Sequence, residues 1–307
     1  MVRNVIAPIT EFSATPRERR RRPYLWTMTA DPLRNSLRAI WSAAAPSWGE
    51  YADYIDARSI AVTHAMIDAA GLRLGENVLE LACGPGGLGM AAAEVVGPDG
   101  SVVLSDIAPE MTALAEERAR VRALGNVSVR QVDLEAIEYP DASFDAVLCR
   151  EALMLVPDPA TAVAQARRVV KPGGRVVFAV WGPRGRNPWL GVLLDAVSRR
   201  LGVPVPPPGV PGPFSLSDGE SLRELLVTAD LHDVDIGEVA TPMHADSFEQ
   251  WWTMVPSLAG PVRPLLASLP DEMTEAILSD ARAALDQYAR PDGYELPGVS
   301  LVGSGRG

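Results

Sequence analysis

The sequence predicts an α/β protein built on a parallel sheet with helices on both faces. Between residues 71 and 182, short apolar runs alternate with helix-forming runs, which is the order that such a sheet requires. A glycine-rich turn follows the first apolar run, and acidic residues end the second and third. With 307 residues, of which 47% are hydrophobic, the chain can bury a full core in one large or two small domains.

The first expected strand, Val78 to Ala82, leads into a glycine-rich turn and then a helix over Met90 to Val96. Because glycine lets the backbone approach a ligand closely, strand, turn and helix together indicate a nucleotide site. The turn fits the pattern G-x-G-x-x-G, which also occurs in NAD-binding enzymes. The turn runs through Cys83, Gly84 and Gly86.

Three acidic residues lie in or directly after the first three expected strands. Glu80 lies inside the apolar first strand, where a carboxylate costs free energy unless a ligand or a donor pairs with it. Asp106 ends the strand that begins at Ser101, and an acid there can accept two hydrogen bonds from a ribose diol. Asp133 ends the strand Val127 to Val132 and can reach an adenine amino group. An NAD site explains Asp106 but neither Glu80 nor Asp133.

Four further strands are expected along the chain. Phe144 to Cys149 is the fourth, and the helix after it ends at the sharp stop Lys171 to Gly174. The fifth strand, Arg175 to Trp181, follows at once. A sixth runs around Val234 to Ala240, and a short last strand runs from Val299 to Gly303.

Helical spacing marks the segments that flank these strands. Ser36 to Ala70 is expected to form two helices that cap the nucleotide site. Trp189 to Leu201 is a third helix, and Leu222 to Ala229 is a fourth, with Ser217-Asp218 as its N-cap. Two more helices are expected later in the chain, over Asp246 to Val255 and Asp271 to Tyr288.

The order of these segments resembles the class I S-adenosylmethionine (SAM)-dependent methyltransferases. The branch that it resembles contains small-molecule enzymes similar to ubiquinone/menaquinone-biosynthesis methyltransferases. The resemblance implies a Rossmann-like sheet of seven strands, mostly parallel, with an antiparallel last strand between the fifth and sixth, plus a helical cap and lid. The matching segments are Val78 to Gly86, Ser105 to Met111, Pro140 to Val147 and Val169 to Gly174.

The resemblance implies SAM as the cofactor and gives each matching residue a place around it. Glu80 and the backbone from Ala82 to Gly86 would lie near the methionine part, and Asp106 would hold the ribose hydroxyls. The family often has glycine where this chain has Ala82. Arg150, at the end of the fourth strand, is counted with the cofactor-binding residues. The residues around adenine would be Ile107, Met111, Asp133 and Leu134.

The acceptor half of the site is expected beyond the carboxyl ends of the strands, under the helical cap and lid. His244, beside the lid, and Glu151, after the fourth strand, are the candidate general bases. The lid is rich in Met and Trp, which is typical of a hydrophobic core but also of a cavity for an apolar or aromatic acceptor. In the cavity interpretation, one of Trp251 and Trp252 lines it with Met243 and Met254.

The predicted function is transfer of a methyl group from SAM to a small apolar or aromatic metabolite, such as a phenol, quinol or polyketide of secondary metabolism. Oxygen, nitrogen and carbon acceptors stay open. One alternative is an NAD-linked oxidoreductase. Another is a SAM-fold protein without methyl transfer, which uses the cavity for cyclisation or only binds a ligand.

Composition predicts a cytoplasmic protein that binds neither nucleic acid nor membranes. The net charge is −11, and residues 1–22 contribute +4, so the rest of the chain is strongly acidic and repels phosphates. Cys83 and Cys149 lack metal-ligand spacing and are expected to be small buried thiols in a reducing compartment, and no metal site is predicted. A homodimer stays open.

The domain organisation follows from these patterns. Residues 1–30 are expected to be a flexible basic arm, and residues 31–70 an N-terminal helical cap. Residues 71–307 would form the SAM-binding domain, with lid insertions at about 183–215 and 243–290.

Overall fold

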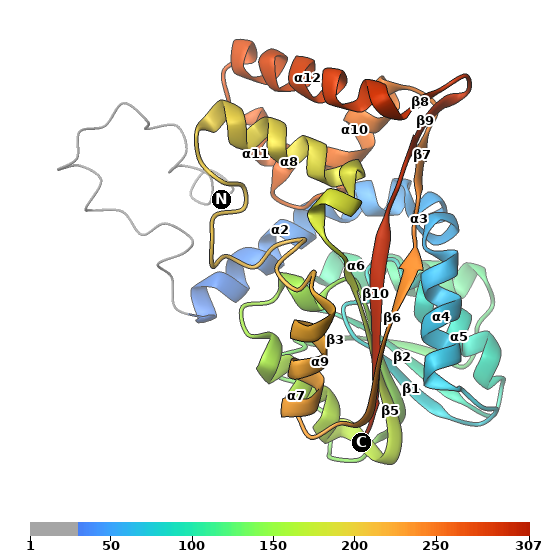
Figure 1. The fold of residues 1–307 in the computed structure, drawn as a ribbon. Helices are drawn as coiled ribbons and strands as arrows, with labels where there is room; N and C mark the ends of the chain where they lie inside the picture. Colours follow the sequence, from blue (N-terminus) through green and yellow to red (C-terminus); the bar gives the residue numbers. More distant parts are fainter. Residues whose placement is uncertain (1–29) are drawn as a thin grey trace.

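The structure, a computed structural model, describes residues 30–307 and contains a seven-stranded sheet with helices on both faces (Figure 1). The strand order is β3-β2-β1-β4-β5-β10-β6, and β1 to β5 are parallel. The predicted arm, residues 1–30, lies outside the described residues except for Ala30. The strands are β1 (Asn77–Glu80), β2 (Ser101–Asp106), β3 (Val127–Gln131), β4 (Phe144–Arg150), β5 (Val170–Trp181), β6 (His232–Ala240) and β10 (Val299–Arg306).

The last strand of the sheet confirms the predicted topology. β10 lies between β5 and β6 and is antiparallel to both. Ser300 lies opposite Trp181 of β5 and Val239 of β6. The start of β10 therefore lies at the same edge of the sheet as the carboxyl ends of the parallel strands.

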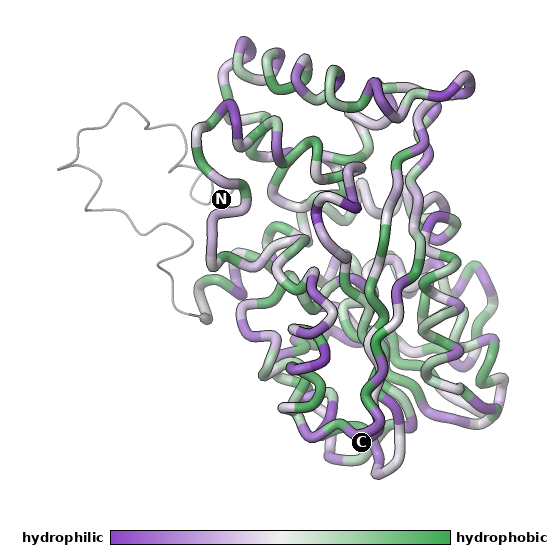
Figure 2. The backbone as a smooth tube through the Cα atoms, viewed as in Figure 1, coloured by the Kyte–Doolittle hydropathy of each residue, from purple (hydrophilic) through white to green (hydrophobic). Residues whose placement is uncertain are grey.

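Two apolar cores, one on each face, hold the helices against the sheet. One contains side chains of α7 (Pro159–Val169) and α9 (Gly219–Thr228). The other contains side chains of α4 (Ile60–Ala70), α5 (Gly87–Val96) and α6 (Pro109–Val121). Figure 2 shows hydrophobic stretches running along the central strands between these two layers.

Helix starts agree with the capping residues in the sequence. The side chain of Asp218 accepts a hydrogen bond from the Ser221 N–H, so α9 begins at Gly219, as the predicted cap requires. Ser247 caps α10 (Phe248–Leu258) in the same way, through the Gln250 N–H. This helix therefore begins two residues later than predicted.

The N-terminal cap consists of three helices and not the predicted two. They are α2 (Ala30–Glu50), α3 (Ala52–Arg58) and α4, separated by turns at Tyr51 and Ser59. α2 packs against α6, and α4 packs against one face of the sheet. Among residues 30–307, no helix is both long and apolar enough to cross a membrane.

The two predicted lid insertions pack together into one helical unit with its own hydrophobic core (Figure 1). A three-stranded antiparallel sheet, in the order β7-β9-β8, completes this unit. Short 3-10 turns occur at η3 (Leu153–Leu155), η4 (Arg184–Arg186) and η5 (Asp286–Tyr288). The elements of the helical unit are α8 (Pro188–Leu201), β7 (Met243–Ala245), α10, α11 (Val262–Ala267), α12 (Asp271–Leu285), β8 (Ala289–Arg290) and β9 (Gly293–Leu296).

The Met and Trp side chains of the lid belong to this core. Trp251 is fully buried, and its Nε1 donates a hydrogen bond to the backbone oxygen of Trp189 at 2.9 Å. Met243 and Met254 are buried in the same cluster, while Trp252 is partly exposed at its edge. The expectation that one of the two tryptophans lines an acceptor cavity with these methionines is therefore wrong, because they fill the space between helices.

Candidate functional site

The glycine turn after β1 has a backbone conformation that favours glycine. Gly84 and Gly86 have φ values of 52° and 83°, in the left-handed region. Gly86 also precedes α5 as its N-cap, and a Cβ there would lie 2.9 Å from Cδ1 of Leu104. The turn thus places bare backbone at the carboxyl end of β1, where open parallel sheets bind ligands.

Ala82 has a φ of 50° and is strained, because a Cβ is unfavourable in the left-handed region. The sequence identified this position as a departure from the family, and the backbone angle explains why glycine suits it. We expect Ala82→Gly to stabilise the protein by at most about 1 kcal/mol, since the relief of strain is partly offset by the entropy of glycine in the unfolded chain.

The matched control is Ala123→Gly, at an exposed residue after α6 with a φ of 55°. Thermal melts should show a similar gain in both variants, and calorimetric titration should show tighter SAM binding only for Ala82→Gly. Equal SAM affinities in the two variants would rule out an effect of the Ala82 methyl group on the cofactor.

The two cysteines are buried thiols. Cys83 follows Ala82, and its Sγ lies 3.4 Å from the Gly84 oxygen, to which it can donate a hydrogen bond. Burial raises the pKa of both thiols, that of Cys149 to about 12. Both are therefore protonated at neutral pH, and Cys83 contributes its backbone to the glycine turn.

Asp106 ties the end of β2 to the glycine turn. Its Oδ2 accepts a hydrogen bond from the Gly84 N–H at 3.0 Å, and its Oδ1 accepts one from the Ala108 N–H at 2.9 Å. Burial raises the pKa of this carboxyl, and the backbone N–H groups of Ala108, Gly84 and Ile107 oppose the shift. Each oxygen keeps a second lone pair, so the carboxylate can still accept bonds from a ribose diol.

Glu80 is buried in β1 and accepts one hydrogen bond, from the Gly89 N–H of α5 at 2.8 Å. Burial raises its pKa to about 8, although the Gly89 N–H and the Arg150 guanidinium favour the charged form. The sequence prediction that this carboxylate needs a donor is confirmed. With one bond for two oxygens, Glu80 has acceptor capacity left for a ligand.

The raised pKa of Glu80 predicts a pH-dependent stability. The folded protein keeps the proton up to about pH 8, whereas the unfolded chain loses it above about pH 4.5. The folded state therefore binds more protons in this window, and stability falls as the pH rises through it, by about 1.4 kcal/mol per pH unit at most. Glu80→Gln should flatten this slope in denaturant titrations between pH 5 and 8. Identical slopes in both proteins would show that Glu80 is ionised in the folded state.

Arg150 ends β4 and contacts the cap helices. Its Nη1 donates a hydrogen bond to Thr63 Oγ1 of α4 at 2.7 Å, and its Nη2 lies 3.8 Å from Asp56 Oδ1 of α3. Arg118 of α6 also pairs with Asp56, at 2.7 Å. Arg150 thus holds the cap helices to the end of β4, and its guanidinium partly opposes the rise in the pKa of Glu80.

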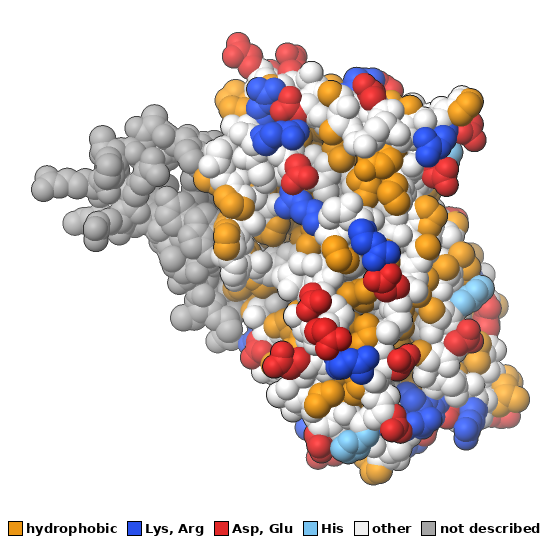
Figure 3. Space-filling model, viewed as in Figure 1, with side chains coloured by type: hydrophobic (Ala, Val, Ile, Leu, Met, Phe, Trp, Pro, Cys, Tyr) orange, Lys and Arg blue, Asp and Glu red, His pale blue; other side chains and the backbone are white. Residues whose placement is uncertain are grey.

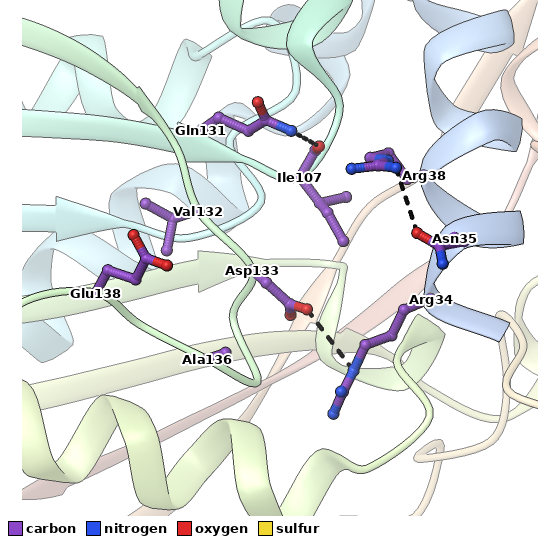
Figure 4. A pocket seen from close by; sticks show the side chains of 9 residues that line it. All are labelled: Arg34, Asn35, Arg38, Ile107, Gln131, Val132, Asp133, Ala136 and Glu138. Atoms are coloured by element: carbon purple, nitrogen blue, oxygen red, sulfur yellow. Dashed lines mark hydrogen bonds and ion pairs between the residues drawn. The ribbon is translucent and has the colours of Figure 1, made fainter. Parts of the chain in front are cut away.

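A cavity of about 440 Å³ lies at the carboxyl ends of β2 and β3 (Figure 4). Two of the predicted adenine residues, Ile107 and Asp133, line it. Arg34 of α2 lies across its mouth, with Nε 3.7 Å from Asp133 Oδ2 and 2.8 Å from Glu135 Oε2. The lining residues are Arg34, Asn35, Arg38, Ile107, Gln131, Val132, Asp133, Ala136 and Glu138.

The other two predicted adenine residues lie behind the wall of this cavity. Met111 packs with Ala45 and Ala108 in a small apolar cluster under α2, and Leu134 belongs to the main core. Both are nearly fully buried. They support the cavity, and the structure does not bring them to its surface.

Trp48 of α2 covers the glycine turn. Its ring lies 3.7 Å from the position that a Cβ would take at Gly84. Its indole Nε1 is buried and has no hydrogen-bond partner among residues 30–307. The sequence predicted that this helix caps the site, and an unpaired buried donor beside a bare backbone turn fits a polar ligand group that is bound next to them.

The carboxyl ends of β4, β5 and β6 carry a second polar cluster. Glu151 follows β4 with a φ of 58°, and its Oε1 accepts a hydrogen bond from Ser300 Oγ of β10 at 2.8 Å. Arg58, the last residue of α3, stacks on the Trp189 ring at 4.1 Å and donates from Nη2 to the Thr241 oxygen at 3.3 Å. The sequence analysis missed Arg58, because a lone arginine at a helix end carries no signal.

His244 does not join this cluster. Its neighbours in β7, Met243 and Ala245, are buried in the helical core, so alternation places the His244 side chain on the opposite face. The imidazole is 50% exposed and lies 3.5 Å from the exposed carboxylate of Asp246. Only its backbone oxygen contacts the cap, as acceptor of the Tyr54 hydroxyl. The structure thus gives it no place as a general base.

Comparison with known proteins finds similarity to methyltransferases. A family model described as "Methyltransferase domain" matches residues 72–182. The ubiquinone/menaquinone biosynthesis C-methyltransferase UbiE of Escherichia coli O1:K1 is 39% identical over 184 residues, 60% of this chain and 70% of that protein. The UbiE of Enterobacter sp. (strain 638) is 34% identical over 167 residues, 54% of this chain, and the chain spans 64% of its length.

Solved structures share the fold. A protein of Bacillus halodurans C-125 superposes with a TM-score of 0.53 at 19% identity, covering 80% of this chain and 97% of that one. The YcgJ protein of Bacillus subtilis gives 0.52 at 21% identity, covering 80% and 98%.

The described residues fit SAM at both ends of the molecule. Asp106 and Asp133 offer acceptors for its ribose and adenine, and Glu80 and the bare turn at Gly84 offer hydrogen-bonding capacity and room for its methionine part. This fit and the identity with the Escherichia coli protein over most of that protein's length lead to one assignment. The chain belongs to the class I SAM-dependent methyltransferases and is related to the ubiquinone/menaquinone-biosynthesis enzymes.

Proposed function

We propose that the protein transfers the methyl group of SAM to a small apolar or aromatic acceptor. The observation that supports this proposal is a division of the carboxyl edge of the sheet. The predicted cofactor residues follow β1, β2 and β3, whereas aromatic rings gather beyond β5. Trp181 contacts the rings of Trp189 and Phe214, with centroids 4.8 Å and 6.2 Å apart.

The chemical nature of the acceptor atom depends on the part of the chain beyond the family match. The match ends at residue 182, before α8 and the rest of the helical unit. The relatives are C-methyltransferases by name, which makes a ring carbon one candidate beside oxygen and nitrogen. The NAD-linked alternative is not favoured, because the matching family model is that of a methyltransferase domain.

In the mechanism that we propose, the protein acts mainly by positioning SAM and the acceptor relative to each other. SAM supplies the electrophilic methyl group when it is bound. Asp106 and the glycine turn would hold SAM in place, and Trp48 of α2 would cover it. Correct alignment of two reactants accounts for about 7–11 kcal/mol of a barrier in well-oriented systems. Glu151 is the candidate base where an acceptor proton must leave, a role worth about 10²–10⁴-fold in rate.

The first experiment is a calorimetric titration with SAM and, separately, with NAD. We expect SAM to bind and NAD not to bind. The second experiment incubates the protein with methyl-labelled SAM and a panel of phenols, quinols and aromatic amines, with label transfer read by mass spectrometry. SAM binding without transfer to any compound would favour the cyclase or binding-only alternative, and NAD binding alone would overturn the proposal.

On the face drawn in Figure 3, basic and acidic side chains of the described residues lie interspersed. A small-molecule acceptor, a cytoplasmic location and the homodimer option stay predictions. Sedimentation analysis of the full chain measures the oligomeric state directly.

A further inference from the structure

Three buried polar atoms beyond the carboxyl ends of β5 and β6 have no hydrogen-bond partner among residues 30–307. They are Arg58 Nε, Thr241 Oγ1 and Trp181 Nε1. The residues adjoin one another, because Arg58 donates to the Thr241 backbone oxygen and lies over the Trp189 ring, which contacts Trp181 edge to face. Thr241 is only 2% exposed. Buried polar groups nearly always have partners, so this cluster indicates a polar ligand group that the chain itself does not supply.

Glu151 provides a negative charge beside this cluster. Its Oε1 accepts a hydrogen bond from Ser300 Oγ, and Ser300 lies opposite Trp181 in the sheet, which places the Glu151 carboxylate next to the cluster. Arg58 has its hydrogen bond elsewhere, with the Thr241 oxygen. The left-handed backbone of Glu151 is costly for a residue with a Cβ, and its N–H is held by the Ala179 oxygen at 2.7 Å. Arg58 and Glu151 therefore lie near each other with their hydrogen bonds to other groups. The remaining donors of Arg58 and the remaining acceptors of Glu151 are available to a ligand.

Resting on the proposed function, we infer that Arg58 and Glu151 select the acceptor through one neutral hydroxyl group on an apolar skeleton. A hydroxyl can accept from the Arg58 guanidinium and donate to the Glu151 carboxylate at the same time. A carboxylate in this position would be repelled by Glu151, and an ammonium by Arg58. Because the two charges balance, the pair discriminates against charged groups of either sign, while the partly exposed Trp181 offers an apolar surface to the skeleton.

The test uses three probes with one skeleton: 2-naphthol, 2-naphthoate and 2-naphthylmethylammonium. Equilibrium dialysis against the full chain saturated with S-adenosylhomocysteine measures their binding. We expect 2-naphthol to bind about tenfold more tightly than either ion, a difference that one charge-assisted hydrogen bond can supply. Glu151→Gln should reduce the discrimination against 2-naphthoate, and Arg58→Gln that against the ammonium, whereas Arg58→Lys should keep the wild-type order.

Arg186→Gln is the control, because the ion pair of Arg186 with Glu238 is half exposed. It should change none of the three affinities. Melting curves check folding, and if Arg58→Gln does not fold, Glu151→Gln decides alone through the naphthoate response. The inference is overturned if no probe binds, if all three bind equally, or if a folded variant keeps the wild-type preference. Failure of SAM binding in calorimetry would instead overturn the proposed function and leave the probe preference as a separate result.

Discussion

Replacing Asp106 with alanine is expected to weaken SAM binding at least tenfold. An ionised carboxylate that accepts from two hydroxyls forms charge-assisted bonds worth about 1.5–3 kcal/mol each. The same carboxylate fastens the glycine turn through Gly84 and the start of α6 through Ala108, so the variant also loses the support of the turn. The melting temperature of the cofactor-free protein should therefore fall, in addition to the loss of affinity.

Two further variants separate these effects. Asp106→Asn keeps one acceptor oxygen for the turn but lacks the charge, so it should retain more stability than alanine while still binding SAM weakly. Asp99→Ala removes an exposed carboxylate between α5 and β2 and should leave SAM affinity unchanged. Calorimetry that gives wild-type affinity for a folded Asp106→Ala would remove this residue from the cofactor site.

Gly89→Ala is expected to destabilise the fold by about 3 kcal/mol or more. In an open helix this change would stabilise by up to about 1 kcal/mol, because alanine has the higher helix propensity. Here, however, the new Cβ would lie 2.1 Å from Leu104 Cδ2 and 2.4 Å from Glu80 Oε2. Both side chains are buried, so neither can yield without moving the core, and the hydrogen bond from the Gly89 N–H to Glu80 would be lost as well.

Gly125→Ala is the control for this clash, because nothing lies within 4 Å of a Cβ at that exposed turn residue. Denaturant unfolding should show a change of about 0.5 kcal/mol at most for the control. A Gly89→Ala protein as stable as wild type would mean that α5 can move away from β1, and that the pairing of Gly89 with Glu80 is not required by the fold.

Sequence reasoning predicted the strands, the glycine turn and the placement of the acids at one edge of the sheet because these features are local. The strand, the glycine turn and the acids at the strand ends are short-range features, and the sheet brings their carboxyl ends to one edge whatever the rest of the chain does. Met111 and Leu134 show the limit of this reasoning. They lie in the predicted segments, but whether a side chain faces the cavity or the core depends on how α2 packs over them.

The proposed acceptor half depends on contacts between distant segments and could not be predicted in the same way. Position after β6 favoured His244, but the pairing of β7 with β9, about fifty residues later, decides which face its side chain takes. Arg58 reaches Thr241 across 183 residues of sequence. The spacing of Met and Trp residues on α10 would likewise be the same whether their side chains filled a core or lined a cavity. Only the elements that pack against α10 distinguish the two cases.

The seven residues of α3 link the two halves of the site. Asp56 lies against the start of α5, where a Cβ on Gly87 would fall 1.8 Å from its Oδ1, and Arg58 two residues later lies in the acceptor cluster. Because the helix is too short to bend between them, a shift at one end moves the other. If the proposed acceptor binds there, linkage requires that any change in its affinity caused by the cofactor has an equal counterpart in cofactor affinity, and α3 is the element that can carry this coupling.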